Sequence, residues 1–265
     1  MPRDPRLRSV RSPWLPCIAG MGIALALLSG CGSKSSPTSP GGGGGGGGGG
    51  TTTFTGVITG PTESGKITLT ISTTTPSPTR AFRSAATVAA SGSVKINGGA
   101  AIAMSGTYDL DTHEVNAAGG GYTFVGAYDS QITPPAITGL YNGPNGQGYF
   151  VCPAGDGNAV KAYCGTFHNA GQTSNGSWNF LVSGTNIIGL SWAAGDPGPL
   201  YLTGTMSGTG TTRTIALEGI TQDGVTVSAT GSLNTSTNAV NGTWTVTDGT
   251  GAVVDNGTWS GSACP

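Results

Sequence analysis

Apolar and polar side chains alternate strictly in the stretch Lys66-Ile67-Thr68-Leu69-Thr70-Ile71-Ser72. A period of two residues puts the aliphatic side chains on one face of a β-strand and the polar side chains on the other. The same alternation recurs in residues 177–183 and 225–228. These stretches predict half-buried strands, and no stretch after residue 31 has the 3.6-residue period that indicates a helix.

Short turn signals separate the alternating stretches. Asn-Gly and Asp-Gly dipeptides accept the positive φ angles of tight hairpin turns. They occur at Asn97-Gly98, Asn145-Gly146, Asp156-Gly157, Asp223-Gly224, Asp248-Gly249 and Asn256-Gly257. Charged residues make up only 9% of the chain, and Thr and Ser fill the polar faces, so β propensity exceeds helix propensity. The sequence predicts an all-β fold, an antiparallel meander closed as a barrel or folded as a sandwich.

Two halves of the chain resemble each other. Residues 97–116 align without a gap with residues 222–241, and five of the twenty positions are identical. A Gly-x-aromatic triplet also recurs, at Gly106-Thr107-Tyr108, Gly139-Leu140-Tyr141, Gly176-Ser177-Trp178, Gly242-Thr243-Trp244 and Gly257-Thr258-Trp259. We therefore expect two related β modules, residues 53–153 and 161–265, with one continuous β domain over 53–265 as the alternative.

The first 31 residues have the three parts of a secretory signal. Four arginines between residues 3 and 11 precede an apolar run over residues 18–28, which is shorter than the roughly 20 residues that span a bilayer. The run ends in Leu28-Ser29-Gly30-Cys31, which resembles the lipobox of bacterial lipoproteins at all four positions. The resemblance implies that residues 1–30 are a signal peptide and that Cys31 carries a diacylglycerol and an N-acyl chain.

Residues 31–52 are expected to be a tether that follows the lipid. They include an unbroken glycine run over residues 41–50 and, after Cys31, no apolar side chain, so they cannot bury a core. A Gly-rich coil of this length reaches roughly 25 Å. The resemblance implies a membrane-anchored, extracytoplasmic protein. Because Gly32 replaces the Asp that tends to retain such proteins at the inner membrane, it implies the outer membrane, at its periplasmic face or at the cell surface, if the host is Gram-negative.

The charged residues limit the classes of partner that the chain can bind. Without residues 1–30 the chain keeps seven basic and eleven acidic side chains, a formal charge near −4, and no cluster of Lys and Arg. Nucleic-acid phosphates demand a basic face, so we expect no nucleic-acid partner. The predicted partners are the membrane, through the lipid, and a glycan or surface-protein ligand. No motif indicates a cofactor.

The cysteines suggest one disulfide in an oxidising compartment. Cys152, Cys164 and Cys264 remain after the signal and the lipid site are set aside. The Cys164–Cys264 pairing is favoured, because by the chain-entropy model its longer loop contributes about 4–5 kcal/mol, against about 3 kcal/mol for the alternative, Cys152–Cys164.

Catalytic residues are hard to find in this sequence. His113 and His168 lie in or near predicted turns, and no Gly-x-Ser-x-Gly nucleophile elbow occurs. The alternating acids Asp109, Asp111 and Glu114 could form a weak site for a hard cation such as calcium. The alternative interpretation, which is favoured, is an ordinary hairpin turn rich in Asp. We therefore assign no catalytic residue and no metal site.

Aromatic side chains are the remaining functional candidates. They could stack on a ligand or fill the core beside their glycines, and core packing is favoured. The candidates are Trp178, Trp192, Trp244, Trp259, Tyr108 and Tyr141. The sequence favours a non-catalytic binding, adhesive or structural module of the cell envelope. Two alternatives stay open: an exported hydrolase that uses His168 or turn aspartates, and a small-ligand carrier with a cavity inside a barrel.

Overall fold

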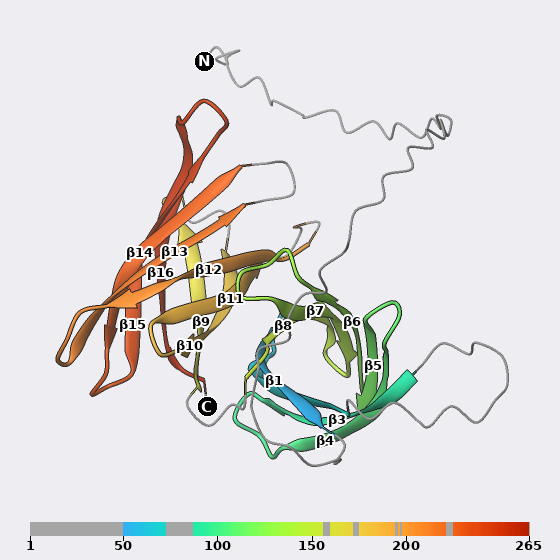
Figure 1. The fold of residues 1–265 in the computed structure, drawn as a ribbon. Coiled ribbons are helices and arrows are strands. Elements are labelled where there is room, and N and C mark those ends of the chain that lie inside the picture. Colours follow the sequence, from blue (N-terminus) through green and yellow to red (C-terminus); the bar gives the residue numbers. More distant parts are fainter. Residues whose placement is uncertain are drawn as a thin grey trace, which may run out of the picture. The chain divides into compact units, whose positions relative to one another are not determined.

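The computed structural model describes residues 50–72, 87–155, 160–171, 175–193, 196, 198–220 and 225–264. These residues form sixteen antiparallel strands and contain no helix, so the all-β prediction is confirmed (Figure 1). Among them, no helix is long and apolar enough to cross a membrane. All the strands lie within one compact unit, Gly47–Pro265. The predicted signal, Cys31 and most of the predicted tether lie outside the described residues.

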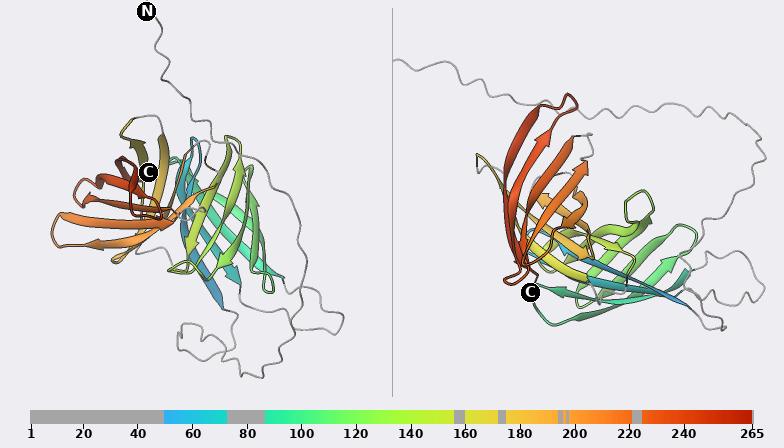
Figure 2. Two further views of the ribbon diagram at one scale, coloured as in Figure 1. Left: turned by 90° about the horizontal axis from the view of Figure 1, so that it is seen from above. Right: turned by 60° about the vertical axis from the view of Figure 1, so that its left-hand side comes forward.

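The first eight strands form a closed barrel in which each strand pairs with the next in the chain. Figure 1 looks nearly along its axis, and the left view of Figure 2 shows it from the side. Three pairs between the first and eighth strands, Val57 to Thr59 with Val151 to Tyr149, close the ring. The strands are β1 (Thr51–Thr59), β2 (Ser64–Ser72), β3 (Thr87–Ile96), β4 (Ile102–Asp109), β5 (Glu114–Gly119), β6 (Tyr122–Asp129), β7 (Ala136–Gly143) and β8 (Gly146–Pro153).

The last eight strands form a second closed barrel with the same meander order. The final strand pairs with the ninth from Gly257–Asn169 to Ala263–Tyr163, which closes the ring. The barrel prediction is thereby confirmed and the sandwich is not formed. The strands are β9 (Val160–Asn169), β10 (Asn175–Ser183), β11 (Asn186–Ala193), β12 (Leu200–Ser207), β13 (Thr212–Ile220), β14 (Thr226–Asn234), β15 (Ala239–Thr247) and β16 (Val253–Ala263).

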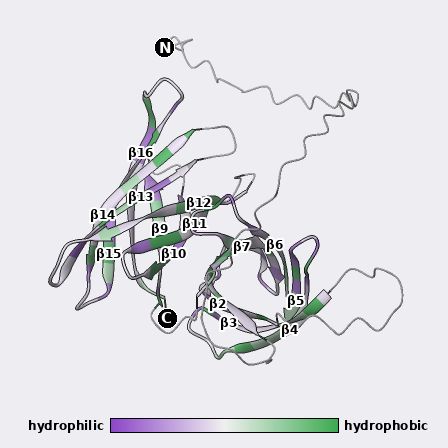
Figure 3. Cartoon of the chain, viewed as in Figure 1, coloured by the Kyte–Doolittle hydropathy of each residue, from purple (hydrophilic) through white to green (hydrophobic). Residues whose placement is uncertain are grey.

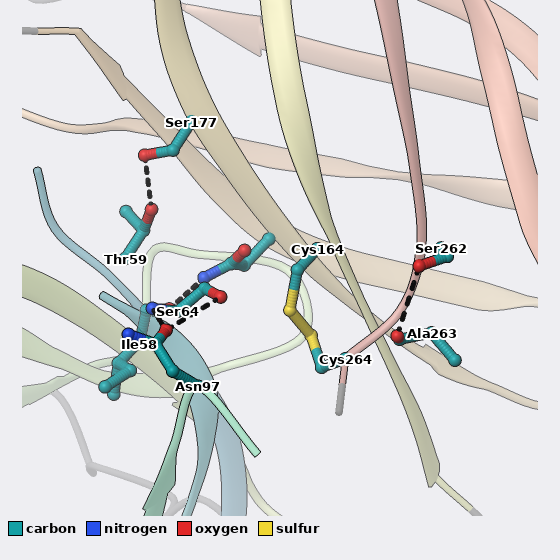
Figure 4. The surroundings of a disulfide bond; sticks show 10 residues. Ile58, Thr59, Ser64, Asn97, Cys164, Ser177, Ser262, Ala263 and Cys264 are labelled. Carbon is teal, nitrogen blue, oxygen red and sulfur yellow. Dashed lines mark hydrogen bonds between the residues drawn. A yellow bond between two sulfur atoms is a disulfide. The ribbon is translucent and has the colours of Figure 1, made fainter. Parts of the chain in front are cut away.

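A disulfide joins Cys164 of β9 to Cys264, which directly follows β16 (Figure 4). The two Cα atoms are 5.1 Å apart, and the Cys264 N–H donates to the carbonyl of Ala162 at 2.9 Å. The bond therefore fastens the first strand of the second barrel to its last. It is the pairing that the sequence favours. The alternative, Cys152–Cys164, is not formed, because Cys152 lies fully buried inside the first barrel as a free thiol.

Alternation along the strands fills each barrel with apolar side chains, and Figure 3 shows apolar and hydrophilic residues following one another along the strands. Phe124, Tyr141 and Phe150 are fully buried in the first barrel. In the second barrel the Trp178 ring stacks on Phe180 with ring centroids 4.8 Å apart. A Cβ at Gly261 would lie 2.7 Å from the Trp178 ring, so the bare backbone there makes room for the indole.

The sequence repeat corresponds to a repeated hairpin turn. In the first barrel, Asp109 Oδ1 accepts hydrogen bonds from the N–H groups of Asp111 and Thr112, at 2.8 and 2.9 Å. Asn234 Oδ1 does the same for the residues two and three positions further on. The residue that follows each turn has a positive φ, 61° at His113 and 56° at Asn238. The β4–β5 and β14–β15 hairpins therefore share their turn geometry, although they are the fourth and fifth strands of the first barrel and the sixth and seventh of the second.

The two barrels meet through a buried seam. Thr59 Oγ1 lies 2.7 Å from Ser177 Oγ, and the Asn179 side-chain amide donates to the Ile58 carbonyl (Figure 4). An apolar cluster continues the seam and consists of Val57, Ala136, Val151, Leu181, Ile188 and Leu190. Strands β1, β10 and β11 are consequently buried on both faces.

Two local predictions need correction. The stretch 177–183 alternates as a half-buried strand does, yet its polar face is also buried, because Asn179 and Leu181 face the seam. The Asn256-Gly257 dipeptide lies inside β16 and forms no turn. Its strand pairs continue on both sides, so the glycine there serves packing inside the barrel.

Candidate functional site

Four of the six aromatic candidates are core residues. Trp178 and Trp259 are 4% and 5% exposed in the second barrel, and Tyr108 and Tyr141 are 8% and 0% exposed in the first. The two buried indole N–H groups donate to the carbonyls of Thr166 and Thr243, at 3.1 and 3.2 Å. These four side chains therefore fill the barrel cores, which is the interpretation that the sequence favoured over ligand stacking.

The other two candidates remain half-buried and lie in different places. Trp192 lies on the seam side of β11, where its ring centroid is 6.2 Å from that of Tyr149 on β8. Trp244 lies near the end of β15, inside the second barrel. Both indole nitrogens are shielded and have no hydrogen-bond partner among the described residues. A shielded donor without an acceptor costs about 1–3 kcal/mol.

Trp244 forms an aromatic pair with Phe167 of β9. The ring centroids are 6.0 Å apart and the planes are nearly perpendicular, at 86°. The two residues lie on strands that flank β16, where Trp244 pairs with Gly257. On the other side of β16, Gly257 pairs with Asn169 and Trp259 pairs with Phe167. A second glycine, Gly176, lies under Phe167, since a Cβ there would collide with the phenyl ring.

Beyond this pair, two acids lie on the β15–β16 hairpin. Asp255 pairs with Val246, two positions further toward the strand ends than Trp244. Asp248 begins the β15–β16 turn, and hydrogen bonds from the side chain and backbone of Thr250 lower the pKa of its carboxyl. Val253 and Val254, each 58% exposed, add apolar surface to the same hairpin. Residues 172–174, 194–195, 197 and 221–224 are outside the described residues.

Strand register identifies the equivalent end of the first barrel. Val115 pairs with Gly126 as Val240 pairs with Gly261, within the equivalent hairpins. Four residues further along β5 and β15, the pairs are Gly119–Tyr122 and Trp244–Gly257. The end that carries Tyr122 in the first barrel therefore corresponds to the end that carries Trp244 in the second.

A buried carboxylate caps that end of the first barrel. Glu63, only 3% exposed, accepts hydrogen bonds at Oε1 from the Tyr122 hydroxyl at 2.8 Å and the Asn145 amide at 2.9 Å. Burial, and then the hydrogen bond and charge of Glu63, raise the pKa of Tyr122 to about 12. Burial and the nearby Glu63 also raise the pKa of Tyr141, whose buried hydroxyl has no hydrogen-bond partner among the described residues. We term this group, Glu63, Tyr122, Tyr141 and Asn145, the Glu63 cap.

The Glu63 cap is not predicted by any local sequence pattern. Its members come from the β1–β2 turn, β6, β7 and the β7–β8 turn, which only the closed barrel brings together. One signal was present, because Glu63 is one of only three glutamates in a chain dominated by Thr, Ser and Gly.

The predicted weak cation site is a structural turn. The Asp109 carboxylate is occupied by backbone N–H groups, chiefly of Thr112 and Asp111, and these hydrogen bonds lower its pKa. Asp111 and Glu114 are exposed. Within the described parts of the chain, no three His, Cys, Asp or Glu side chains are grouped so that they could hold a metal ion.

The two histidines lie in different barrels. His113 Nδ1 is 3.1 Å from the Tyr108 hydroxyl, at one end of the first barrel. His168 is on the outer face of β9, with Nδ1 2.6 Å from Asn175 Oδ1 on the paired strand. Each histidine is exposed.

Compared with known proteins, the chain matches no family model, no curated protein and no solved structure. The fold and the two half-buried tryptophans are therefore the basis for a functional proposal.

Proposed function

We propose that this chain is a lipid-anchored, extracytoplasmic binding module without catalytic activity, whose ligand contacts the Trp244 end of the second barrel. One observation carries the binding site. The same end of the two barrels is built differently, since the Glu63 cap covers it in the first barrel and a half-buried aromatic pair occupies it in the second.

Burial supports a surface site over a cavity inside a barrel. An eight-stranded barrel is just wide enough for its own side chains to fill it, or to hold one small ligand. In both barrels, large apolar side chains occupy the described interior, with Phe150 and Phe180 fully buried. A carrier would need an unfilled cavity in that interior. The Trp244 end, by contrast, combines half-buried aromatic rings with the carboxylates of the β15–β16 hairpin.

The lipobox resemblance of Leu28-Ser29-Gly30-Cys31 supports the location. An acylated Cys31 followed by a glycine tether would hold the barrels roughly 25 Å from the bilayer. Metabolic labelling with palmitate tests this in cells that express the full chain. Label should enter the protein and be lost in Cys31→Ser, while Cys17→Ser, a matched control within the signal, keeps it. Equal labelling of Cys31→Ser would refute the anchor.

A glycan array, followed by a screen of purified envelope proteins, tests the binding role of the full chain in detergent. We expect a bound ligand that is released unchanged, and binding that is lost in Trp244→Ala and kept in Trp192→Phe. Circular dichroism checks that both variants fold. Turnover of a bound glycan that is abolished by His168→Ala would replace this proposal with the exported hydrolase.

A further inference from the structure

The second barrel repeats the strand pairing of the first in a shifted order. The shared turn matches β4 to β14 and β5 to β15. Continuing around each closed ring matches β6, β7 and β8 to β16, β9 and β10, and β1, β2 and β3 to β11, β12 and β13. Under this match every strand pairing keeps its register. Around the first barrel the matched pairs are Gly56–Ile67, Ile71–Ala90, Ala90–Gly106, Tyr108–Val115, Val115–Gly126, Gly126–Gly139, Gly139–Phe150 and Phe150–Ile58. Their counterparts in the second barrel are Gly189–Leu202, Met206–Ile215, Ile215–Gly231, Leu233–Val240, Val240–Gly261, Gly261–Gly165, Gly165–Trp178 and Trp178–Ser191.

Side-chain packing gives the same match independently. A Cβ at Gly126 would lie 2.7 Å from the ring of Phe150 on β8. A Cβ at its counterpart, Gly261, would lie 2.7 Å from the ring of Trp178 on β10. The ends of a closed meander lie side by side, so they can be joined and the chain opened at another turn without loss of a strand pair. The second barrel is therefore arranged as a circular permutant of the first.

The seam brings matched strands of the two barrels together. Strand β1 contacts β10 and its own counterpart β11, and β8 contacts β11. Thr59 Oγ1 lies 2.7 Å from Ser177 Oγ (Figure 4), and the ring centroids of Tyr149 and Trp192 are 6.2 Å apart. The strand match makes Trp192 the counterpart of Thr59, and Ser177 the counterpart of Tyr149. Each contact is therefore the other with the barrels exchanged, which is the defining property of an isologous, two-fold interface.

We infer that the outer face of this strand pair is a docking surface for a second barrel of the same construction, and that the chain is such a dimer joined end to end. The centre of the surface is apolar in both barrels, because Val57 and its counterpart Leu190 are fully buried in the seam. Ala136 and its counterpart Ala162 belong to the same apolar cluster. In the intact chain the two surfaces occupy each other. An isologous interface is closed, so the intact chain should not assemble further through this face.

Side-chain size determines which pair of barrels is preferred. Within the chain, the small hydroxyl residues Thr59 and Ser177 face each other, and so do the aromatic residues Tyr149 and Trp192. Two first barrels would instead place Tyr149 against Thr59 twice, and two second barrels would place Trp192 against Ser177 twice. Such contacts leave a gap or force a shift, so like barrels should pair more weakly than the two barrels of the chain.

Cutting the chain between the barrels tests the docking surface. The Cys164–Cys264 disulfide lies within the second barrel, so after the cut only the seam holds the barrels together. A protease site is inserted within residues 156–159 of the full chain, and native mass spectrometry in detergent follows the cut protein. The two barrels should stay paired at micromolar concentration. At higher concentration pairs of like barrels should appear, with dissociation constants about tenfold or more above that of the unlike pair. Barrels that separate on cutting would overturn the inference, as would unlike pairs alone at every concentration.

Exchange of the two seam contacts tests the two-fold relation. Thr59→Trp with Ser177→Tyr crowds one contact, and Tyr149→Ser with Trp192→Thr empties the other. Each double variant should weaken the pairing of the cut barrels about tenfold or more. All four substitutions together transfer the aromatic pair to the other contact and should restore the pairing. Circular dichroism and the protection of Cys152 from maleimide check that each variant folds. A folded combined variant that pairs as weakly as the double variants would overturn the inference.

Discussion

Loss of the Cys164–Cys264 disulfide is expected to destabilise the second barrel and to leave the first nearly unchanged. The bond joins residues 100 positions apart and ties β9 to the residue after β16, the two strands whose pairing closes the ring. The double variant Cys164→Ser, Cys264→Ser removes the bond and leaves the ladder between the two strands intact.

The loop length sets the expected magnitude. By the chain-entropy model, a loop of this length restricts the unfolded chain by about 4.7 kcal/mol, and measured values for disulfides range from about 2 to 5 kcal/mol. A domain of this size has an m-value of about 2 kcal/mol per molar urea. The unfolding midpoint of the second barrel should therefore fall by about 1–2.5 M urea.

Intrinsic probes separate the two barrels in one urea titration. The four tryptophans after residue 50 all lie in the second barrel, so tryptophan fluorescence follows its unfolding. Cys152, fully buried in the first barrel, becomes open to maleimide labelling only when that barrel opens. A fluorescence midpoint that does not move when the disulfide is lost would refute the argument, as would an equal fall in the Cys152 midpoint.

Three further predictions concern packing and pH. Gly261→Ala should cost about 1–3 kcal/mol in chemical denaturation, because its Cβ would lie 2.1 Å from the Cys164 carbonyl oxygen and 2.7 Å from the Trp178 ring. Gly249→Ala, with open space around it, should be neutral, and equal effects of the two variants would contradict the packing argument. The raised pKa of Tyr122 means that the folded state favours the neutral phenol, so this contribution to the free energy of unfolding is complete below pH 10 and is lost as the pH rises through about 12. The free energy of unfolding measured against pH should show this loss, and Tyr122→Phe should flatten the profile in that range. Burial also raises the pKa of the Cys152 thiol, so the native protein should not react with Ellman's reagent at Cys152 at pH 8, and rapid reaction there would show that the first barrel is open.

Local pattern predicts the strands well and their closure poorly. The alternation of Ile67, Leu69 and Ile71 is a property of neighbouring residues, and β2 forms where it predicts. Closure depends on pairs such as Val57 with Val151, which are remote in sequence and share no local signal. For the same reason, Asn179 looks like a solvent-facing residue and is buried in the seam.

The candidate site shows the same limit. Trp244 and Trp259 both stand in Gly-Thr-Trp triplets, and both side chains enter the second barrel. Trp259 pairs with Gly242 in mid-strand and is 5% exposed, whereas Trp244 lies nearer the strand end and stays half-buried. The identical triplets differ in burial because they lie at different positions along the barrel, and that position depends on the register of the strands.

Hydroxyl-radical footprinting of the full chain in detergent tests the central claim most directly, because it reports where a ligand lies. With a saturating concentration of a ligand identified by the glycan array or the protein screen, we predict that oxidation of Trp244 and Phe167 falls severalfold while that of Trp192 is unchanged. Undiminished oxidation of Trp244 in the presence of the bound ligand, or protection confined to Trp192, would contradict the assignment of ligand binding to this end of the second barrel.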